Sequence, residues 1–462
     1  MRSLGVCLVL AAMSLAATAA GAQPLTPALV LGERLDASVD IPRMRTAGVQ
    51  AVRLNLDWPS VAPKTRPEQF DARDPADPAY SWESFDRQVS AAAAAGLDPI
   101  VDIVGAPAWA EKAVPRPFYG AIKPSASELA LFAQAAAQRY GGNFDGLPRV
   151  RNWMLWNEPN LIFWLQPQFE RGRPYSPGLY RKLLNAFADA VHGVHADNVV
   201  IAGATAPFTS ADGLTAKWGV APLAFLRTLL CLGRDLRPTC SARAKFDVWA
   251  HHPYTSGGPS HHANFPDDVS LGDLPKMKAV LDAGVRTRKV VSRHRVRFWV
   301  TEFSWDTSPP DPEAVPLALQ ARWVSEAMYT MWRNGVSLVT WYTLVDEPFP
   351  ASSYQSGLYF VGGKPKPTLT AFRFPFVALH DGSRLRLWGR TPLGAAGRVI
   401  VQKQDGAWRR FAVVRADRYG IFNVKRPFTS GLYRARFAGE TSLGFSTTEP
   451  PDRFYRPFGT VR

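Results

Sequence analysis

Short apolar segments alternate with helical patterns between about residues 28 and 350 of this 462-residue chain, and this alternation constrains the fold more than any other feature. The segments are rich in Val, Ile, Leu and Trp with little polar alternation, as expected of strands buried on both faces. Strands separated by helices form parallel sheets, so eight such segments predict a (β/α)8 barrel. The expected strands are 28–31, 51–56, 99–104, 153–156, 199–202, 246–250, 298–301 and 337–341.

Helix signals occupy the gaps between these segments. Ser125-Ala126-Ser127-Glu128 is a capping-box pattern ahead of an apolar periodic run, and Gly141-Gly142 marks the end of that helix. The competing architecture is a doubly wound open sheet. It lacks support because no Gly-rich phosphate-binding turn follows the first expected strand.

The pattern changes after about Phe376, where short alternating runs are separated by turn signals such as Asp405-Gly406. This predicts a small antiparallel β-sandwich of about 75 residues. No Ser/Thr/Gly-rich linker precedes it, so we expect the sandwich to pack rigidly on the barrel. Trp388 and Trp408 lie in the alternating runs and are expected to pack against the barrel rather than bind carbohydrate.

The first residues resemble an export signal. Arg2 supplies a positive start, residues 4–20 are apolar and small, and Ala20-Gly21-Ala22 fits a cleavage site. The alternative is an uncleaved N-terminal anchor, but the apolar run is short for a membrane span. The expected division is a signal peptide at 1–22, the barrel at 23–376, the sandwich at 377–448 and a Pro/Arg-rich tail at 449–462.

Cysteine usage agrees with an exported protein. Cys7 lies in the signal, which leaves Cys231 and Cys240 as an even pair. We expect a disulfide between them, in the long excursion between the fifth and sixth barrel strands, where it would stiffen a wall of a cleft. The alternative is two unpaired thiols.

The net charge of +15 excludes few functions. Only Arg2 leaves with the signal, so 53 basic and 39 acidic residues give +14 afterwards. A basic surface suits anionic polysaccharides, cell-wall polymers or membranes, but the arginines are scattered along the chain and compositional bias is an adequate explanation. The absence of a nucleic-acid-binding motif argues against nucleic acid as a partner.

Two glutamates follow expected barrel strands on opposite sides of the barrel. Glu158 follows the fourth strand and Glu302 the seventh. Active sites of (β/α)8 enzymes lie at the C-terminal ends of the strands, so both side chains can point to a common centre. A protonated and an ionised carboxyl group about 5–5.5 Å apart are what retaining cleavage of a glycosidic bond requires. This chemistry needs no metal or organic cofactor.

The residues around these glutamates resemble those of clan A glycoside hydrolases, most closely the family 39 and family 5 groups. Trp156-Asn157-Glu158-Pro159-Asn160 is similar to their acid/base motif, and Glu302 matches the position of their nucleophile. The segments 105–110 and 251–254 also have counterparts there. The resemblance covers roughly residues 28–376.

The resemblance implies roles for several residues. Glu158 is implied as general acid/base and Glu302 as nucleophile, with Arg53 supporting Glu302 by its opposite charge. The other implied substrate-binding residues are Asn157 on the sugar 2-hydroxyl, His252 in the wall of the site, Tyr254 on the nucleophile, and Trp341 as the platform under the −1 sugar.

Further candidates rest on residue type and place alone. The candidates for stacking on sugars, each with plain packing as its alternative, are Trp109, Trp164 and Trp305. Asp102 is a candidate on the third strand, whereas His251 is expected to face away from the site. Asp346 and Glu347 are expected to be exposed loop acids.

The sequence therefore predicts a secreted retaining glycosidase that acts on an extracellular oligo- or polysaccharide. The alternatives are a transglycosylase that uses the same residues, or a catalytically dead barrel that binds carbohydrate. The paired glutamates favour the enzyme. The sugar, the linkage and any protein partners are not indicated by the sequence.

Overall fold

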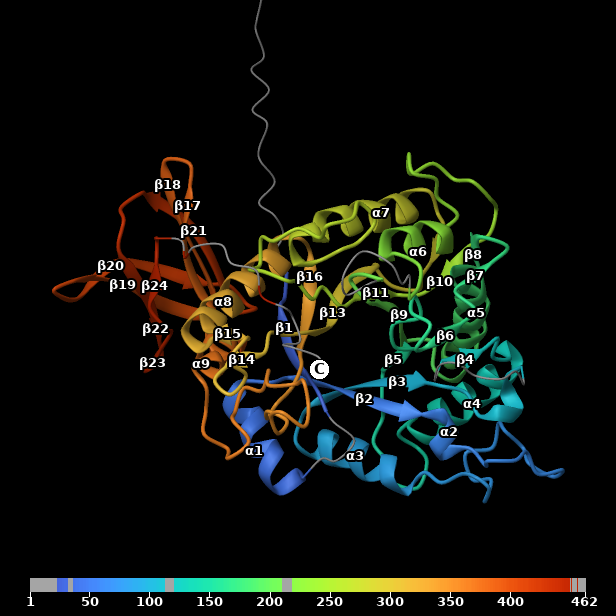
Figure 1. Cartoon of the computed structure of the whole chain (residues 1–462). Helices are drawn as coiled ribbons and strands as arrows, with labels where there is room; N and C mark the ends of the chain where they lie inside the picture. Colours follow the sequence, from blue (N-terminus) through green and yellow to red (C-terminus); the bar gives the residue numbers. More distant parts are fainter. Residues whose placement is uncertain are drawn as a thin grey trace, which may run out of the picture.

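Eight parallel strands close into a barrel at the centre of the molecule, in the order β1-β16-β13-β11-β9-β5-β3-β2, and Figure 1 shows them as a ring surrounded by helices. This computed structural model describes residues 23–31, 36–112, 120–209, 218–448, 450 and 455. All eight expected strands are present, so the predicted barrel is confirmed. The strands are β1 (Thr26–Val30), β2 (Ala51–Asp57), β3 (Asp98–Val104), β5 (Asn152–Leu155), β9 (Val199–Thr205), β11 (Val248–His251), β13 (Arg297–Phe303) and β16 (Val336–Trp341).

The barrel lumen is filled by one cluster of buried side chains to which every barrel strand contributes. The cluster combines the large Trp299 with several alanines, as expected of a barrel whose lumen is filled by side chains. Side chains alternate along a strand, so these residues fix which positions face inward. The cluster comprises Ala28, Ala51, Ile100, Met154, Ile201, Ala204, Val248, Ala250, Trp299 and Leu338.

Helices cover the outside of the barrel and bury their apolar faces against the strands. At the start of α4, the Ser125 side chain accepts from the Glu128 N–H at 3.3 Å, as the capping-box pattern predicts. The Glu128 side chain, which a complete capping box would direct back to the Ser125 N–H, pairs with Arg66 instead. The helices are α1 (Ala37–Ala47), α2 (Trp58–Val61), α3 (Glu83–Ala94), α4 (Ala126–Arg139), α5 (Ser176–Val194), α6 (Pro222–Leu229), α7 (Leu274–Arg286), α8 (Leu317–Arg333) and α9 (Pro367–Arg373), with 3-10 turns at Ala108–Ala110, Leu271–Asp273 and Pro392–Gly394.

Four short strand pairs lie in the described loops that connect the barrel strands and helices. They are β4 (Ala121–Ile122) with β6 (Leu165–Gln166), β7 (Phe169–Glu170) with β8 (Arg173–Pro174), β10 (Ala244–Lys245) with β12 (Val290–Val291), and β14 (Thr307–Ser308) with β15 (Val315–Pro316). Among the described residues, no helix combines the length and the apolar character needed to cross a bilayer. The predicted signal peptide lies outside the described residues, as does most of the predicted tail at 449–462.

The C-terminal part forms two antiparallel sheets, which confirms the predicted β-sandwich. Figure 1 shows them on the left, beside α8 and α9. One sheet contains β17 (Phe376–Asp381), β18 (Arg384–Arg390) and β21 (Ile421–Pro427). The other contains β20 (Ala407–Ala416), β19 (Gly397–Asp405), β22 (Leu432–Phe437) and β23 (Glu440–Thr441), and β24 (Phe445–Ser446) pairs with β22.

Aromatic packing joins the sandwich to the barrel. Trp388 of β18 is fully buried, with its ring 5.5 Å from Tyr329 and 5.8 Å from Trp332 of α8. Its predicted packing role is confirmed. Trp408 differs, because its ring is covered by the Arg434 guanidinium at 4.1 Å within the sandwich itself.

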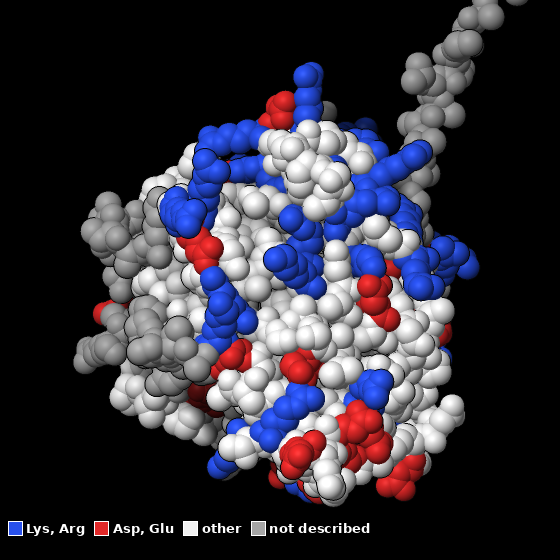
Figure 2. Space-filling model, turned by 90° about the vertical axis from the view of Figure 1, so that its right-hand side faces the viewer, with Lys and Arg blue, Asp and Glu red and all other residues white. Residues whose placement is uncertain are grey.

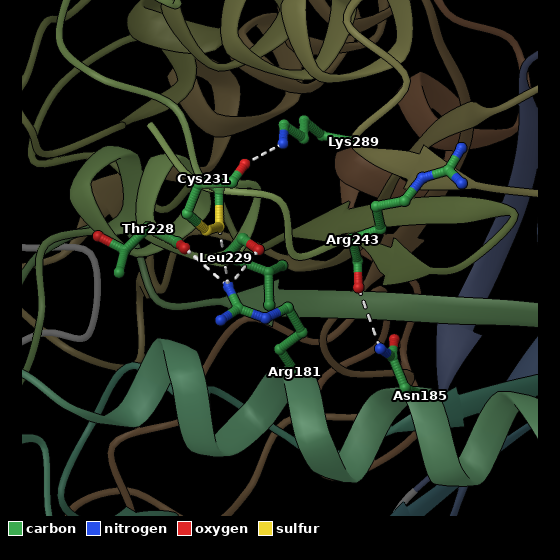
Figure 3. Close-up of a disulfide and its surroundings, with 8 residues drawn as sticks. Arg181, Asn185, Thr228, Leu229, Cys231, Arg243 and Lys289 are labelled. Carbon is green, nitrogen blue, oxygen red and sulfur yellow. Dashed lines mark hydrogen bonds between the residues drawn. A yellow bond between two sulfur atoms is a disulfide. The ribbon is translucent and has the colours of Figure 1, made fainter. Parts of the chain in front are cut away.

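The predicted disulfide joins Cys231 and Cys240, which follow α6. Figure 3 shows how neighbouring elements hold this loop. Arg181 of α5 donates to the carbonyls of Thr228 and Leu229 at 3.1 and 2.9 Å, and Lys289 donates to the Cys240 carbonyl.

Removing this disulfide is expected to lower stability. Replacing Cys231 and Cys240 together by alanine should reduce the free energy of unfolding by about 2–3 kcal/mol, because a cross-link restricts the unfolded chain. Denaturant titration measures the change. A reducing agent should shift the unmodified protein in the same way and leave the double variant unaffected, and equal unfolding midpoints for the two proteins would contradict the expectation.

Candidate active site

A cavity of about 580 Å³ opens at the C-terminal ends of the barrel strands and contains both glutamates. Glu158 lies three residues beyond the end of β5, and Glu302 is the penultimate residue of β13. Arg53 and Asn157 also line the cavity, so the structure brings these predicted residues together. The other lining residues are Val30, Asn55, Asp57, Pro59, Val104, Gly105, Ala106, Ala121, Phe163, Trp164, Tyr342 and Tyr354.

Arg53 is the centre of a hydrogen-bond network beneath the cavity. Its buried guanidinium donates from Nη2 to Asp102 Oδ2 at 2.7 Å and to Asn157 Oδ1 at 2.6 Å. Its Nη1 donates to Glu302 Oε2 at 3.1 Å. A charge removed from water needs such partners.

A local irregularity of β13 aims Glu302 into the cavity. Trp299 belongs to the lumen cluster, so strict alternation would place Glu302 on the outer face of the barrel. The pairing of β13 with β16 shifts register between Val300 and Phe303. After the shift Glu302 faces the cavity and Phe303 packs outward, as expected of a β-bulge beside a functional site.

Tyr254, which follows β11, is the second partner of Glu302. Its hydroxyl donates to Glu302 Oε1 at 2.7 Å. Burial and the neighbouring Glu302 carboxylate raise the pKa of Tyr254 well above its usual range, so the phenol keeps its proton. Each Glu302 oxygen therefore has a donor, one from Tyr254 and one from Arg53.

His252 lies between the two glutamates. Its Nδ1 is 3.1 Å from Glu158 Oε1 and 3.8 Å from Glu302 Oε2, while its Nε2 is 3.4 Å from Arg53 Nη1 and 3.1 Å from Thr301 Oγ1. Arg53 can only donate, so Nε2 carries the lone pair and Nδ1 carries the proton. Burial lowers the pKa of His252 to about 3, which keeps the ring neutral.

Glu158 differs from Glu302 in its surroundings. Burial raises its pKa to about 7, against the opposing effects of Arg53 and of a hydrogen bond from the Trp164 side chain. No guanidinium pairs with it directly among the described residues. A carboxyl group in such a place holds its proton near neutral pH.

The turn that carries Glu158 has a strained backbone and is held in place by hydrogen bonds. Trp156 and Glu158 have φ angles of 71° and 38°, which side chains other than glycine rarely adopt. Asn160 holds the turn, since its Nδ2 donates to the Ala206 and Val220 carbonyls at 3.2 Å and its Oδ1 accepts from the Ala206 N–H at 2.9 Å. The last residue of the Trp-Asn-Glu-Pro-Asn motif therefore fixes the backbone rather than contacting the cavity.

Asp102 of β3 contacts Arg53 rather than the cavity, which it does not line. Burial raises its pKa to about 6 despite the guanidinium beside it. It therefore positions Arg53 from below.

Replacing Arg53 by methionine is expected to destabilise the fold and the site together. It leaves the Asp102 and Glu302 carboxylates without their counterion, and breaking a buried pair in this way costs about 3–5 kcal/mol. Chemical denaturation measures the loss. Arg87→Met on the exposed face of α3 is the matched control and should have little effect; equal effects of the two substitutions would contradict the role of Arg53.

The predicted aromatic platform does not line the cavity. Trp341 is fully buried, donates to the Ser356 carbonyl at 2.8 Å and packs edge-on against Phe303. The next residue, Tyr342, lines the cavity instead, and its ring contacts that of Tyr354 at 4.9 Å. The platform role of Trp341 stays a prediction without support from its position.

The other tryptophan candidates divide. Trp164 lines the cavity. Trp109 donates to the Pro63 carbonyl at 2.8 Å and packs edge-on against Trp58, outside the cavity lining. Trp305 is fully buried and donates to the Gly257 carbonyl at 3.1 Å.

Cavity residues missed from the sequence follow a simple signal. Ala51 belongs to the lumen cluster, so the period of two along β2 places Arg53, Asn55 and Asp57 on the same inner side. The same period of two along β16, starting from Leu338 in the lumen, places Tyr342 on the inner side. Tyr354 arrives on the long loop after β16, which no periodicity indicates.

Two expectations about other residues are wrong. Asp346 is buried, where it pairs with Lys366 at 2.6 Å. Through this pair, Lys366 ties the loop after β16 to the loop after β13. The disulfide does not stiffen the cleft, because its loop follows helix α6 and leads into β11, at the opposite end of the barrel, and none of residues 228–247 lines the cavity. His251 does face away from the site, as expected, toward Thr205 and the Val269 carbonyl.

Comparison with known proteins adds the fold but not a family. No family model matches the sequence, and no curated protein matches it. The structure is similar to a family 39 glycoside hydrolase from the gut symbiont Bacteroides cellulosilyticus WH2, with a TM-score of 0.53 and 19% identity over 87% of this chain and 81% of that chain. It is also similar to a glucosidase from Croceicoccus marinus, with a TM-score of 0.50 and 13% identity over 88% and 94% of the two chains. The resemblance drawn from the motifs is thus confirmed for the fold.

Proposed function

We propose that this protein is a retaining glycoside hydrolase, with Glu158 as general acid/base and Glu302 as nucleophile. One observation carries the proposal: two glutamates share a cavity at the C-terminal end of the barrel but have opposite surroundings. Burial keeps a proton on Glu158 near neutral pH, whereas Glu302 is held by a guanidinium and a phenol. Unequal carboxyl groups of this kind are the requirement of the double-displacement reaction.

In the first step Glu158 donates its proton to the glycosidic oxygen while Glu302 attacks the anomeric carbon. The carbon–oxygen bond of the glycoside breaks, and an ester bond to Glu302 forms. In the second step Glu158, now ionised, takes a proton from water. The water oxygen displaces Glu302 and leaves a sugar with the configuration of the substrate.

The separation of the two glutamates supports retention. Glu158 Oε1 and Glu302 Oε2 both lie close to His252 Nδ1, at 3.1 and 3.8 Å. The two oxygens are therefore at most about 6.9 Å apart, the sum of these distances. Inverting enzymes separate their carboxyl groups by about 6.5–9.5 Å to admit a water molecule, so most of that range is excluded for these two oxygens.

Asn157 and the tyrosines are the proposed contacts to the sugar. Asn157 Oδ1 accepts from Arg53, and its Nδ2 has no hydrogen bond to another described residue, so it can donate to a sugar hydroxyl. Tyr342, Tyr354 and Trp164 supply aromatic walls. His252 orients Glu158 through its Nδ1–H.

We further propose that the protein is exported and acts on an extracellular oligo- or polysaccharide. The signal-like sequence at 1–22 and the disulfide between Cys231 and Cys240 support an oxidising compartment. The proposed domain limits are those of the sequence analysis.

The test is a screen of aryl glycosides and of plant, microbial and host polysaccharides, with Glu302→Gln as the inactive control. Release of sugar by the unmodified protein alone supports the proposal and identifies the substrate. NMR of the first product gives the anomer, and an inverted product would contradict the assignment of Glu302 as nucleophile. Equal release by Glu302→Gln would contradict it as well.

A further inference from the structure

A second, larger cavity lies at the opposite end of the barrel. It has a volume of about 1080 Å³ and is bordered by the N-terminal ends of strands β1, β3, β5, β9, β13 and β16. It shares no lining residue with the cavity of the two glutamates. Its charged and histidine lining residues are Asp98, Arg151, Asp197, Lys278, Asp282, His294, Arg295, Arg297 and Arg418.

Two of the positively charged side chains in this cavity form salt bridges with carboxylates that also line it. Arg151 pairs with Asp197 at 2.7 Å, and Lys278 pairs with Asp282 at 2.6 Å. The remaining carboxyl group is Asp98, which accepts from the Asn152 amide at 2.9 Å and whose pKa is raised by burial.

Three guanidinium groups are left over. Within the described part of the chain, Arg295, Arg297 and Arg418 form no salt bridge, and the Asp98 and Asp247 carboxylates act on Arg297 only from a longer distance. Arg297 is half-buried, and that burial lowers its pKa because its charge is partly removed from water. A partly desolvated guanidinium that forms no direct salt bridge gains more from an incoming anion than an exposed one does.

The aromatic faces in the cavity are covered by the same arginines. The Arg297 guanidinium lies 4.9 Å from the ring centre of Trp299, and that of Arg418 lies 4.8 Å from the ring centre of Tyr419. The cavity therefore offers little stacking surface to a neutral sugar or a nucleobase. Its attraction is for negative charge.

The positive charge continues outside the cavity. Arg286 at the end of α7 is exposed, as are Arg288, Arg293 and Arg295 on the segment that joins α7 to β13. The β10–β12 pairing places this segment beside a second basic segment, that of Arg234, Arg237 and Arg243. Figure 2 shows the Lys and Arg side chains gathered on the upper part of the face that bears α5 and α6. Asp235 is the acidic residue of the second segment.

The disulfide loop holds the two basic segments together. Arg243 Nε donates to the Arg288 carbonyl at 2.8 Å, and Lys289 donates to the Cys240 carbonyl, as Figure 3 shows for Lys289. The basic surface is thus preorganised by covalent and hydrogen-bonded contacts, so little ordering is required when a ligand binds.

We propose that this basic cavity and the basic surface beside it bind an acidic polysaccharide, with Arg295, Arg297 and Arg418 as the contacts to its carboxylate or sulfate groups. Arginine pairs with such groups through two parallel hydrogen bonds. A cavity of this size exceeds the need of a single inorganic anion, and the exposed arginines extend it into a path for a chain. A flexible polysaccharide chain reaches into a cavity, whereas a bilayer presents a flat surface. The site is separate from the glutamates, so the proposal does not depend on the proposed catalysis.

The test measures binding of the full chain to polygalacturonate and to dextran sulfate by isothermal titration calorimetry. Methyl-esterified polygalacturonate and dextran are the neutral controls. The cavity variant is Arg295→Gln/Arg297→Gln/Arg418→Gln, and the matched control is Arg409→Gln/Arg410→Gln/Arg415→Gln on the exposed side of the sandwich. Both variants lose three positive charges, so only position distinguishes them. Arg295→Gln/Arg418→Gln replaces the cavity variant if the loss of the half-buried Arg297 impairs folding.

The expected result is salt-dependent binding to at least one acidic polymer, with affinity lowered roughly tenfold or more in the cavity variant and less than about twofold in the control. The preferred polymer distinguishes carboxylate from sulfate. Equal binding by both variants, equal binding to the neutral polymers, or no binding to either acidic polymer would overturn the proposal. Tighter binding to DNA or to anionic vesicles, lost in the cavity variant, would replace the polysaccharide with that partner. Turnover of a small neutral glycoside should be unchanged in the cavity variant, which separates this test from that of catalysis.

Discussion

Replacing Glu302 by alanine is expected to lower turnover of a glycoside substrate by roughly 10⁴-fold or more, because no other group can form the covalent intermediate. Among the described residues, the hydrogen-bond partners of Glu302 are Tyr254 and Arg53, which are donors that keep their protons and cannot take its place. Steady-state kinetics on the substrate identified by the screen measures the loss. Glu83→Ala on the exposed face of α3 is the control and should retain full activity.

Adding azide to the Glu302→Ala variant gives a more specific test of the nucleophile. The alanine variant leaves space beside the anomeric carbon, so azide can displace the leaving group in one step and form a carbon–nitrogen bond. For a β-glycoside the product is the α-glycosyl azide, and its detection by NMR identifies Glu302 as the nucleophile. Full activity of Glu302→Ala without azide would refute that role.

Replacing Glu158 by alanine is expected to have an effect that depends on the leaving group. General acid catalysis contributes about 10²–10⁴-fold, so turnover of an unactivated glycoside should fall by this factor. A dinitrophenyl glycoside departs without a proton, and its kcat/KM should change much less. Azide should now yield the β-glycosyl azide from a β-glycoside, since it attacks the intermediate on Glu302 rather than the substrate. An equal loss for both leaving groups would contradict the acid role.

The pH dependence follows from the same residue. Glu158 must be protonated in the first step, and burial raises its pKa to about 7. The kcat/KM for an unactivated glycoside should therefore decline as the pH rises through about 7, where Glu158 loses its proton. This basic limb should be absent from the residual activity of Glu158→Gln. A limb that persists in the variant would assign the proton to another group.

The fold could be read from the sequence because its signals are local. An apolar run buried on both faces carries its own signature, and eight of them separated by helices leave few architectures. The same reasoning placed Glu158 and Glu302 at strand ends, and closure of the barrel then brought the ends together. The disulfide pairing followed from a simple count of cysteines.

The details of the site depended on the phase of each strand, that is, on which of its alternating side chains point into the barrel. Trp341 and Tyr342 are neighbours, and the resemblance to clan A enzymes implies Trp341 as the platform. Successive side chains point to opposite sides of a strand, so the lumen position of Leu338 sends Tyr342 to the cavity and Trp341 outward. Knowing that phase requires knowing which residues fill the lumen, which is a property of the closed barrel.

Charge was judged from the sequence as scattered, and along the chain it is. Folding pairs the segment at 234–245 with that at 286–297 and leaves Arg295, Arg297 and Arg418 around one cavity without a salt bridge to any described residue. Which arginines find a carboxylate depends on contacts between distant parts of the chain. Composition alone cannot give that balance.

The sequence by itself determined the strands, their order and the two glutamates that end them, because these depend on residue type and local spacing. Only the tertiary structure decided that Glu302 faces the cavity at all. Alternation from Trp299 would turn it outward, and the register shift between β13 and β16 turns it inward. A shift of register is a relation between two strands, so neither strand's sequence contains it alone.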